Sequence, residues 1–220
     1  MAKTKQEVLA RMRATGLVPV LRANSEEQAM KLVAAMMDGG VDVMEVTMTV
    51  PGAVKVMARI LREFPAMLVG AGTVLDPQAA QACLDEGAEF IVSPALNIAT
   101  IELCQRASIA VLPGALTPTE IVTAWNAGAD VVKVFPASAM GGASYLRSLK
   151  APLPQIELIP TGGVSVPTAQ DFLAAGAFAL GVGADLVNTK AIDAGQPEIV
   201  TEKAKQYLAV VEDFRNTQSA

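Results

Sequence analysis

One lysine lies in a setting that favours amine chemistry. Lys133 interrupts the apolar run 131–135, which otherwise has the composition of a buried β-strand, and no other lysine of the chain has such neighbours. Burial disfavours the charged ammonium form, and a neutral amine is a nucleophile that forms Schiff bases with carbonyl compounds. The alternative is a structural lysine that reaches solvent at the strand end or pairs with a buried acid. From this run alone, both interpretations stay open.

The sequence contains no histidine. This absence excludes a Ser-His-Asp triad, a zinc site with histidine ligands and an imidazole base. Proton transfer must therefore be carried out by carboxylates, tyrosine, lysine or water. Cys83 and Cys104 lie in separate predicted helices without CxxC spacing, and we expect both to be free thiols without a chemical role.

Short β-rich runs alternate with helical stretches along the whole chain. Such an alternation predicts parallel strands joined by right-handed crossovers, and eight units within 220 residues predict an α/β protein with a closed (β/α)8 TIM barrel. An open doubly wound sheet is the competing architecture. No linker or change of composition divides the chain, so residues 1–220 are expected to form a single domain. The predicted strands cover residues 17–23, 41–48, 68–74, 90–94, 110–115, 131–137, 157–163 and 179–186.

An additional N-terminal helix, predicted at residues 3–15, is expected to cover the bottom of the barrel. A repeat supports closure, because a helix-ending glycine, a small residue and then an acid or aromatic residue precede every second strand. Its copies are two strand–helix units apart, so the chain looks built from four similar quarters. Two capping boxes, from Ser25 to Gln28 and from Thr117 to Glu120, predict helix starts. The copies of the repeat are Gly40-Val41-Asp42, Gly87-Ala88-Glu89, Gly128-Ala129-Asp130 and Gly176-Ala177-Phe178.

The second strand carries an acid on the face that should point into the barrel. Glu45 shares this face with Thr47 and Thr49, because side chains alternate along a strand and the apolar residues between them face the helices. An ionisable group inside a barrel is costly unless it has a function. The same alternation puts Lys133 and Phe135 on one face, so Glu45 and Lys133 could converge near the carboxyl-end mouth, where this fold places catalysis. A purely structural ion pair is the alternative.

Glycines follow the last two strands. The seventh strand ends in Thr161-Gly162-Gly163, and the eighth carries Gly181-Val182-Gly183-Ala184. Backbone N–H groups after these two strands form the usual phosphate site of a barrel. Either motif alone could be a simple turn, but their joint position favours phosphate binding.

The charge pattern limits the partners of the chain. The net charge is −5 with acids and bases interspersed, which gives no basic stripe for nucleic acid and no polybasic membrane patch. No apolar stretch reaches the roughly 18 residues of a membrane span, and the first residues do not have the pattern of a secretory signal. We therefore expect a cytoplasmic protein that holds any anionic ligand locally.

Seven motifs, spread almost end to end, resemble the 2-keto-3-deoxy-6-phosphogluconate (KDPG) aldolases. This family also includes 4-hydroxy-2-oxoglutarate (KHG) and phosphogalactonate aldolases. The resemblance implies a class I pyruvate aldolase, which is a carbon–carbon lyase, generally a homotrimer, that cleaves KDPG to pyruvate and D-glyceraldehyde 3-phosphate, or KHG to pyruvate and glyoxylate. No metal or organic cofactor is expected. The motifs are Glu45-Val46-Thr47, Gly70-Ala71-Gly72-Thr73-Val74, Val92-Ser93-Pro94, Pro113-Gly114-Ala115-Leu116-Thr117-Pro118, Val132-Lys133-Val134-Phe135-Pro136, Pro160-Thr161-Gly162-Gly163 and Gly181-Val182-Gly183.

The resemblance also implies roles for single residues. Lys133 matches the Schiff-base lysine and Glu45 the acid/base. Many members have an arginine for the substrate carboxylate where this chain has Thr49, and a serine for the phosphate where it has Ala184. We expect Arg22, as in other members, to clamp the carboxylate with two hydrogen bonds; a solvated Arg22 is the alternative. The other expected contacts with the substrate or its phosphate are Thr73, Pro94, Phe135, Thr161, Gly162, Gly163, Gly183 and the backbone of Ala184.

Three other functions stay open at this point. One is a phosphogalactonate aldolase, because the sequence does not give the stereochemistry of the sugar acid. Another is an epimerase or isomerase barrel in which Glu45 is the base and Lys133 forms no covalent adduct. The third is a barrel that only binds a phosphorylated ligand or serves in an assembly. If the chain forms oligomers, exposed methionines such as Met36 or Met57 are candidates for an interface.

Overall fold

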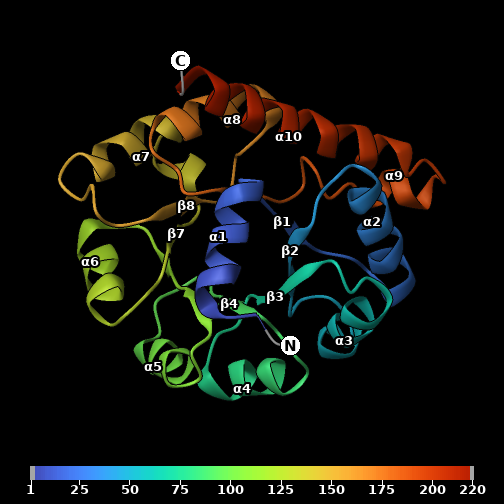
Figure 1. Ribbon diagram of the computed structural model, residues 1–220, viewed down its shortest axis with the longest axis horizontal. Coiled ribbons are helices and arrows are strands. Elements are labelled where there is room, and N and C mark those ends of the chain that lie inside the picture. Colours follow the sequence, from blue (N-terminus) through green and yellow to red (C-terminus); the bar gives the residue numbers. More distant parts are fainter. Residues whose placement is uncertain (1–2, 219–220) are drawn as a thin grey trace.

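The computed structural model describes residues 3–218, which form a ring of parallel strands enclosed by helices (Figure 1). The strands are β1 (Leu17–Leu21), β2 (Val43–Thr47), β3 (Leu68–Gly72), β4 (Phe90–Val92), β5 (Ala110–Leu112), β6 (Gly114–Ala115), β7 (Val132–Val134), β8 (Leu158–Pro160) and β9 (Leu180–Val182). They are hydrogen-bonded in the orders β5-β4-β3-β2-β1-β9 and β6-β7-β8. Because the last strand, β9, pairs with the first, β1, the predicted (β/α)8 barrel is confirmed and an open sheet is wrong.

The fifth strand of the barrel is divided into β5 and β6 at Pro113. Proline has no N–H for the strand ladder, so pairing is interrupted at this residue. The ring continues because β5 pairs with β4 and β6 pairs with β7. An isolated bridge between Thr161 and Gly181 joins the end of β8 to β9.

Helices surround the strands and one helix covers an end of the barrel (Figure 1). The outer helices are α2 (Glu26–Asp38), α3 (Ala53–Glu63), α4 (Pro77–Asp85), α5 (Ile98–Arg106), α6 (Pro118–Asn126), α7 (Ala143–Lys150), α8 (Val166–Ala174), α9 (Thr189–Asp193) and α10 (Glu198–Gln218), with a short 3-10 helix, η1 (Ala137–Met140), before α7. The helix α1 (Lys5–Thr15) lies across the centre of the ring, as expected from the sequence. No helix in the described part of the chain is long and apolar enough to cross a membrane.

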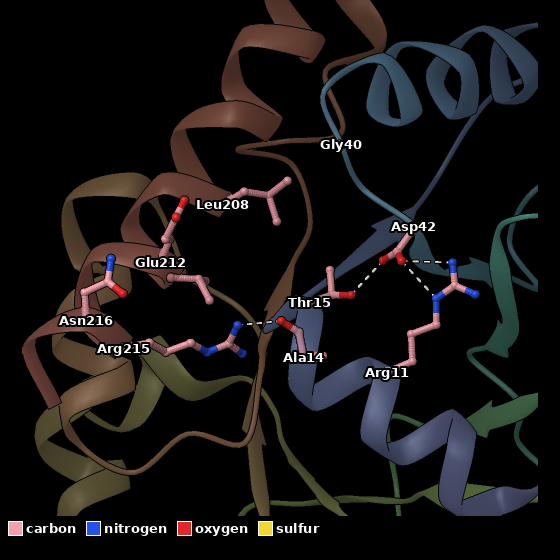
Figure 2. A pocket seen from close by; sticks show the side chains of 10 residues that line it. Arg11, Ala14, Thr15, Gly40, Asp42, Leu208, Glu212, Arg215 and Asn216 are labelled. Carbon is pink, nitrogen blue, oxygen red and sulfur yellow. Dashed lines mark hydrogen bonds and ion pairs between the residues drawn. The ribbon is translucent and has the colours of Figure 1, made fainter. Parts of the chain in front are cut away.

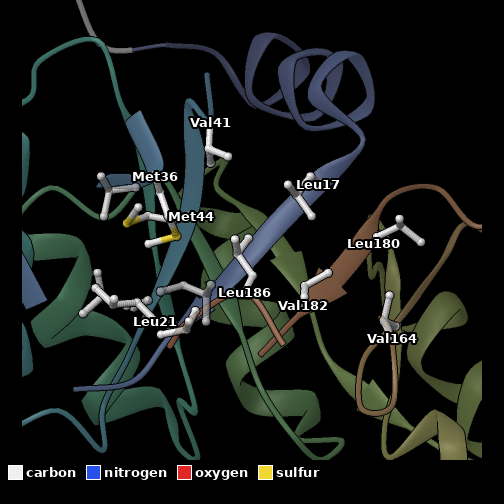
Figure 3. Packing of buried hydrophobic residues seen from close by; sticks show 14 of the residues in the cluster. Leu17, Leu21, Met36, Val41, Met44, Val164, Leu180, Val182 and Leu186 are labelled. Carbon is white, nitrogen blue, oxygen red and sulfur yellow. The ribbon is translucent and has the colours of Figure 1, made fainter. Parts of the chain in front are cut away.

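Strand alternation divides the core into an inner and an outer cluster. Leu17 and Leu21 of β1 belong to the outer cluster, which also contains Met36 and Met44; all four are labelled in Figure 3. Met36 and Met57 are fully buried, so the expectation that they are exposed at an interface is wrong. The inner cluster fills the barrel and includes Val8 and Met12 of α1, Val18, Val43, Leu68, Phe90, Val92, Ala110, Leu112, Val131, Ile159, Phe178 and Ala179.

The predicted fourfold repeat supplies the contacts that hold α1 in place. Arg11 donates to Asp42 at 2.9 Å, Lys3 to Glu89 at 2.5 Å and Lys5 to Asp130 at 3.2 Å. At the fourth copy, the guanidinium of Arg13 lies 4.5 Å from the centre of the Phe178 ring, a distance suited to a cation–π contact. The acid or aromatic residue of each copy therefore contacts the N-terminal segment.

The helix starts agree with the sequence at one of the two predicted capping boxes. The side chain of Thr117 accepts a hydrogen bond from the backbone N–H of Glu120, and the carboxylate of Glu120 accepts one from the backbone N–H of Thr117. Ser25 does cap α2, but the side-chain oxygen of Gln28 accepts from Asn24, and no reciprocal bond to Ser25 forms. The prediction at Ser25 is therefore right for the cap and wrong for the reciprocal bond. The side chain of Gln28 turns toward Asn24 and also donates to Asp193 of α9.

Candidate functional site

Lys133 and Glu45 meet inside the barrel. The amine Nζ of Lys133 donates to Oε1 of Glu45 at 3.2 Å, although β7 and β2 are far apart in the ring. The residues are 5% and 3% exposed, so water contributes little to the solvation of either group. The carboxylate stabilises an ammonium, while burial disfavours separated charges. One proton transfer converts the ion pair into an amine and a carboxylic acid.

The glycine at position 72 leaves room for the Glu45 side chain. In the sheet, Lys133 of β7 pairs with Gly114 of β6 on one side and Ile159 of β8 on the other. This register fixes the position of Lys133 along the barrel axis. A Cβ added to Gly72 would lie 2.6 Å from Oε1 of Glu45, closer than real Cβ atoms come to other atoms. Gly72 therefore keeps open the space that the carboxylate occupies.

A cavity of about 520 Å³ opens beside this pair. Its lining does not include Lys133 or Glu45, so the pair is not part of the cavity surface. Phe135 connects the two features: it lines the cavity, and its ring centre lies 5.7 Å from Nζ of Lys133. The lining consists of Val20, Arg22, Phe135, Thr161, Gly162, Gly163, Val164, Ser165, Gly183, Ala184 and Asp185.

The predicted phosphate residues lie together on this lining. Gly162 and Gly163 have φ angles of 89° and 76°, which side chains other than glycine rarely adopt. Neither the N–H of Gly163 nor that of Ala184 donates to another described residue. Thr161 is buried next to Gly181, where a Cβ would lie 2.1 Å from its hydroxyl oxygen. The cavity thus offers backbone donors suited to an anion.

Arg22 stands between this cavity and a smaller one. It also lines a cavity of about 310 Å³, together with Asn24 and Thr49. Among the described residues, Arg22 has no carboxylate within ion-pair distance. Its guanidinium is therefore available to an anionic ligand from either cavity.

Two predicted substrate residues lie elsewhere. Thr73 follows β3 with a φ of 60°, so the alternation of side chains along this strand ends at Gly72 and does not orient Thr73. Pro94 packs its backbone against Gly114, where an added Cβ would lie 2.2 Å from the Pro94 carbonyl carbon. Neither Thr73 nor Pro94 lines the 520 Å³ cavity.

The lining also contains polar residues that the sequence reasoning missed. Ser165 is the N-cap of α8 and precedes a proline near the helix start, a signal that could have placed it next to Gly163. Asp185 directly follows Ala184 and brings a carboxylate to the expected phosphate site. Its Oδ2 accepts from the hydroxyl of Tyr207 on α10 at 2.6 Å. The sequence gives no signal for this contact, which depends on where α10 packs.

A further cavity of about 450 Å³ lies at the α1 end of the barrel. Figure 2 shows three of its polar side chains bonded to protein atoms: Arg11 and Thr15 donate to Asp42, and Arg215 donates to the carbonyl oxygen of Ala14. These bonds attach the C-terminal end of α1 to β2 and α10. This cavity therefore lies at the end of the barrel opposite the carboxyl-end mouth. Residues at this end normally stabilise the fold and take no part in catalysis.

The two cysteines are buried and lie outside the cavity lining. Burial raises the pKa of the Cys83 thiol to about 11. Burial, and then the nearby carboxylate of Asp130, raises the pKa of the Cys104 thiol to about 11 as well. Both thiols are therefore held in the neutral form, as expected for cysteines without a chemical role.

Comparisons with known proteins point to one family. The family model described as KDPG and KHG aldolase matches residues 8–202. The chain is 34% identical over 190 residues to the KHG/KDPG aldolase of Escherichia coli K12, which covers 86% of this chain and 89% of that protein.

Two solved structures are similar over nearly the whole chain. One is KDPG aldolase from Legionella pneumophila with pyruvate captured as a covalent carbinolamine intermediate; the TM-score is 0.84 at 30% identity, covering 90% of this chain and 96% of that one. The other is the KDPG aldolase of Zymomonas mobilis ZM4 with 3-phosphoglycerate, with a TM-score of 0.82 at 29% identity, covering 94% and 97%.

Proposed function

This chain belongs to the KDPG and KHG aldolase family, and on that premise we propose that it cleaves KDPG to pyruvate and D-glyceraldehyde 3-phosphate through a Schiff base on Lys133. Its activity is that of an aldolase, a carbon–carbon lyase. The observation that carries the assignment of residues is the buried contact of 3.2 Å between Lys133 and Glu45 beside the cavity.

The first steps join Lys133 to the substrate. Proton transfer to Glu45 leaves a neutral amine, which attacks the C2 ketone and forms a carbinolamine. Glu45, directly or through a water, then donates a proton to the departing hydroxyl group. Loss of water gives an iminium, which is the electron sink for the next step.

Cleavage of the C3–C4 bond follows. Glu45, ionised again after the dehydration, removes the proton of the C4 hydroxyl directly or through a water; the C3–C4 electrons move into the iminium, and glyceraldehyde 3-phosphate leaves with its new carbonyl group. The remaining enamine is protonated at C3 by Glu45 and hydrolysed to pyruvate, which restores the amine of Lys133. The apolar ring of Phe135, 5.7 Å from Nζ of Lys133, limits water at the reacting carbon atoms.

Arg22 binds the carboxylate of the substrate in this proposal. Arg22 and Thr49 line the same small cavity, so an arginine directly after β1 reaches the space that many family members fill from the position of Thr49. Because the guanidinium offers paired N–H donors, it can bind both oxygens of a carboxylate at once. Threonine cannot replace that contact.

The phosphate of the substrate is placed against Gly162, Gly163, Gly183 and Ala184. The free N–H groups of Gly163 and Ala184 support this placement, as does the position of Ser165 at the N-terminus of α8. Thr161, buried at the same edge, is assigned together with Thr73 to a position beside the substrate, and Pro94 is assigned with Phe135 to the apolar wall near Lys133.

Borohydride trapping tests the Schiff base. Pyruvate plus borohydride should add a reduced pyruvyl group to Lys133, to be located by peptide mass mapping. Lys133→Met should abolish the adduct, while the matched variant Lys55→Ala, which changes an exposed lysine on α3, should keep it. If folded protein gives no adduct on Lys133, the proposal fails and an epimerase or isomerase barrel becomes the better interpretation.

The range of substrates needs a separate measurement. The C2 ketone and C4 hydroxyl that react are common to KDPG and KHG, so we propose that both are cleaved. Initial rates with KDPG, its galactonate isomer and KHG would rank them. A higher specificity constant for the galactonate isomer would reassign the sugar-acid stereochemistry without affecting the Schiff base.

We also propose a homotrimer, because members of the family generally form one. Exposed apolar side chains supply candidate contact surface: Leu75 and Ile98 are 58% and 46% exposed, and Asn97 links their loops by donating to the Leu75 carbonyl oxygen. Light scattering should give three times the mass of the chain, and a monomer at micromolar concentration would contradict the proposal.

A further inference from the structure

A carboxylate lies where the substrate phosphate is expected. Asp185 follows Gly183 and Ala184 in the loop after β9 and lines the same cavity. A phosphate dianion and an aspartate repel each other, and the repulsion grows as the two groups approach. The affinity of the cavity for a phosphate therefore depends on where the Asp185 side chain is held.

The structure holds Asp185 from the outer helix α10. Its Oδ2 accepts from the hydroxyl of Tyr207 at 2.6 Å, and Nζ of Lys203 lies 3.8 Å from the same oxygen. Lys203 and Tyr207 are separated by one turn of α10 and so lie on the same side of the helix. Both contacts attract the carboxylate toward α10.

Tyr207 is suited to this restraint. The residue is fully buried, and its hydroxyl also lies 3.3 Å from the carbonyl oxygen of Val164, in the loop that follows β8. Burial, with the hydrogen bond to Asp185 second, raises the pKa of Tyr207 well above its usual value. The hydroxyl is thus fixed between the two loops of the predicted phosphate site.

We propose that Tyr207 is a positioning residue that holds the carboxylate of Asp185 toward α10, and in this way sets the affinity of the cavity for a phosphate group. The inference rests on the proposed function for the location of the phosphate. It assigns a specificity role to α10, the outer helix whose Tyr207 and Lys203 contact Asp185. Lys203 supports the restraint by partly neutralising the carboxylate.

Tyr207→Phe is the direct test, because it removes one oxygen and keeps the buried ring. Without the hydroxyl, Asp185 is free to turn toward the anion, and we expect inorganic phosphate to bind about tenfold more weakly in calorimetric titration. KM for KDPG should rise by a similar factor. The kcat for KDPG, both constants for KHG and the pyruvate adduct on Lys133 should remain as in the unmodified protein.

A double variant separates charge from general loosening. If the free carboxylate causes the loss, Asp185→Asn in the Tyr207→Phe background restores phosphate affinity to the level of the unmodified protein or higher. Tyr145→Phe is the matched control, because that hydroxyl donates to Leu116 and does not line the cavity. A loss shared equally by KDPG and KHG, or no recovery in the double variant, would overturn the inference.

Single variants of Asp185 and Lys203 test the inference without changing Tyr207. If Tyr207→Phe does not fold, Asp185→Asn alone should bind phosphate more tightly and Lys203→Met more weakly; unchanged affinity in both would overturn the inference. Phosphate titration requires no turnover. Recovery of phosphate binding in a protein that does not cleave KDPG would support the role of Tyr207 and refute the proposed function, while an unmodified protein that binds no phosphate would refute the role of Tyr207.

Discussion

Oε1 of Glu45 accepts the hydrogen bond from Lys133 and lies where a side chain at Gly72 would begin, since an added Cβ would be 2.6 Å from this atom. Gly72→Ala should therefore push the carboxylate away from the amine. We expect kcat to fall about 10- to 100-fold, because small displacements of a catalytic group are costly. Steady-state kinetics with KDPG would measure it.

A control for this variant lies two residues away on the same strand. Gly70→Ala places its Cβ 2.3 Å from ring carbons of Phe90, so it should lower stability through core crowding without touching Glu45. If Gly72→Ala keeps the kcat of the unmodified protein, Gly72 has no part in positioning the carboxylate.

The buried pair should behave as one unit in stability measurements. Glu45→Leu and Lys133→Met each leave a buried partner unpaired, and we expect each to cost about 3–5 kcal/mol. Because the double variant Lys133→Met/Glu45→Leu leaves no buried charge, it should cost much less than the sum. Chemical denaturation gives all three values, and strictly additive losses would mean that the two groups do not interact.

Replacing Arg22 should weaken binding of the carboxylate. Arg22→Ala is expected to raise KM for KDPG about 10- to 100-fold, the value of a lost charge-assisted bidentate contact. Arg22→Lys should recover part of the loss, since it restores charge but not the paired donors. Arg147→Ala, which changes an exposed arginine on α7, is the control. The pyruvate concentration that half-saturates borohydride trapping should rise in the same order among the variants.

The cysteines should be unreactive in the native protein. Since burial raises the pKa of both thiols to about 11, little thiolate exists near pH 8, and thiolate is the reacting form. Ellman's reagent should modify neither Cys83 nor Cys104 until denaturant is added, and then both. A rapid reaction with one thiol of the folded protein would contradict the burial described here.

The cap of α6 should lose strength in acid. Backbone hydrogen bonds from Thr117 and then Leu116 lower the pKa of Glu120 below its usual value of 4.5. Stability from this carboxylate is therefore complete above the unfolded value and is lost as the pH falls through the folded value. Glu120→Gln should be less stable at neutral pH, and thermal unfolding should show the difference shrinking as the pH falls below the usual carboxyl pKa of 4.5 and on through the lower folded value. A constant difference would exclude the ionised carboxylate as its cause.

Much of the architecture follows from local sequence patterns. The alternation of side chains along β2 and β7 predicted that Glu45 and Lys133 point inward. The repeated glycine motif predicted the positions of the strands that it precedes, which are every second strand of the barrel. These features depend on residues close together in the sequence. The contact of 3.2 Å between the two side chains then follows from closure of the ring.

Other features depend on distant parts of the chain. The strand β3 ends at Gly72, two residues before the predicted end at residue 74, and the positive φ of Thr73 breaks the alternation there. Gln28 turns away from the predicted capping box because Asn24 and Asp193 offer other partners. Asp185 contacts a residue 22 positions away on α10, and no local motif encodes that packing.

The attachment of α1 imposes an order on the assembly of the chain. The partners of this segment include Asp42, Glu89, Asp130 and Phe178, so this segment depends on residues that are synthesised long after it. During synthesis, the apolar side chains Val8 and Met12 stay without their final neighbours until Phe178 and Ala179 have emerged. The earliest helix in the sequence is thus among the last to dock, and a chaperone would have reason to shield it in the meantime.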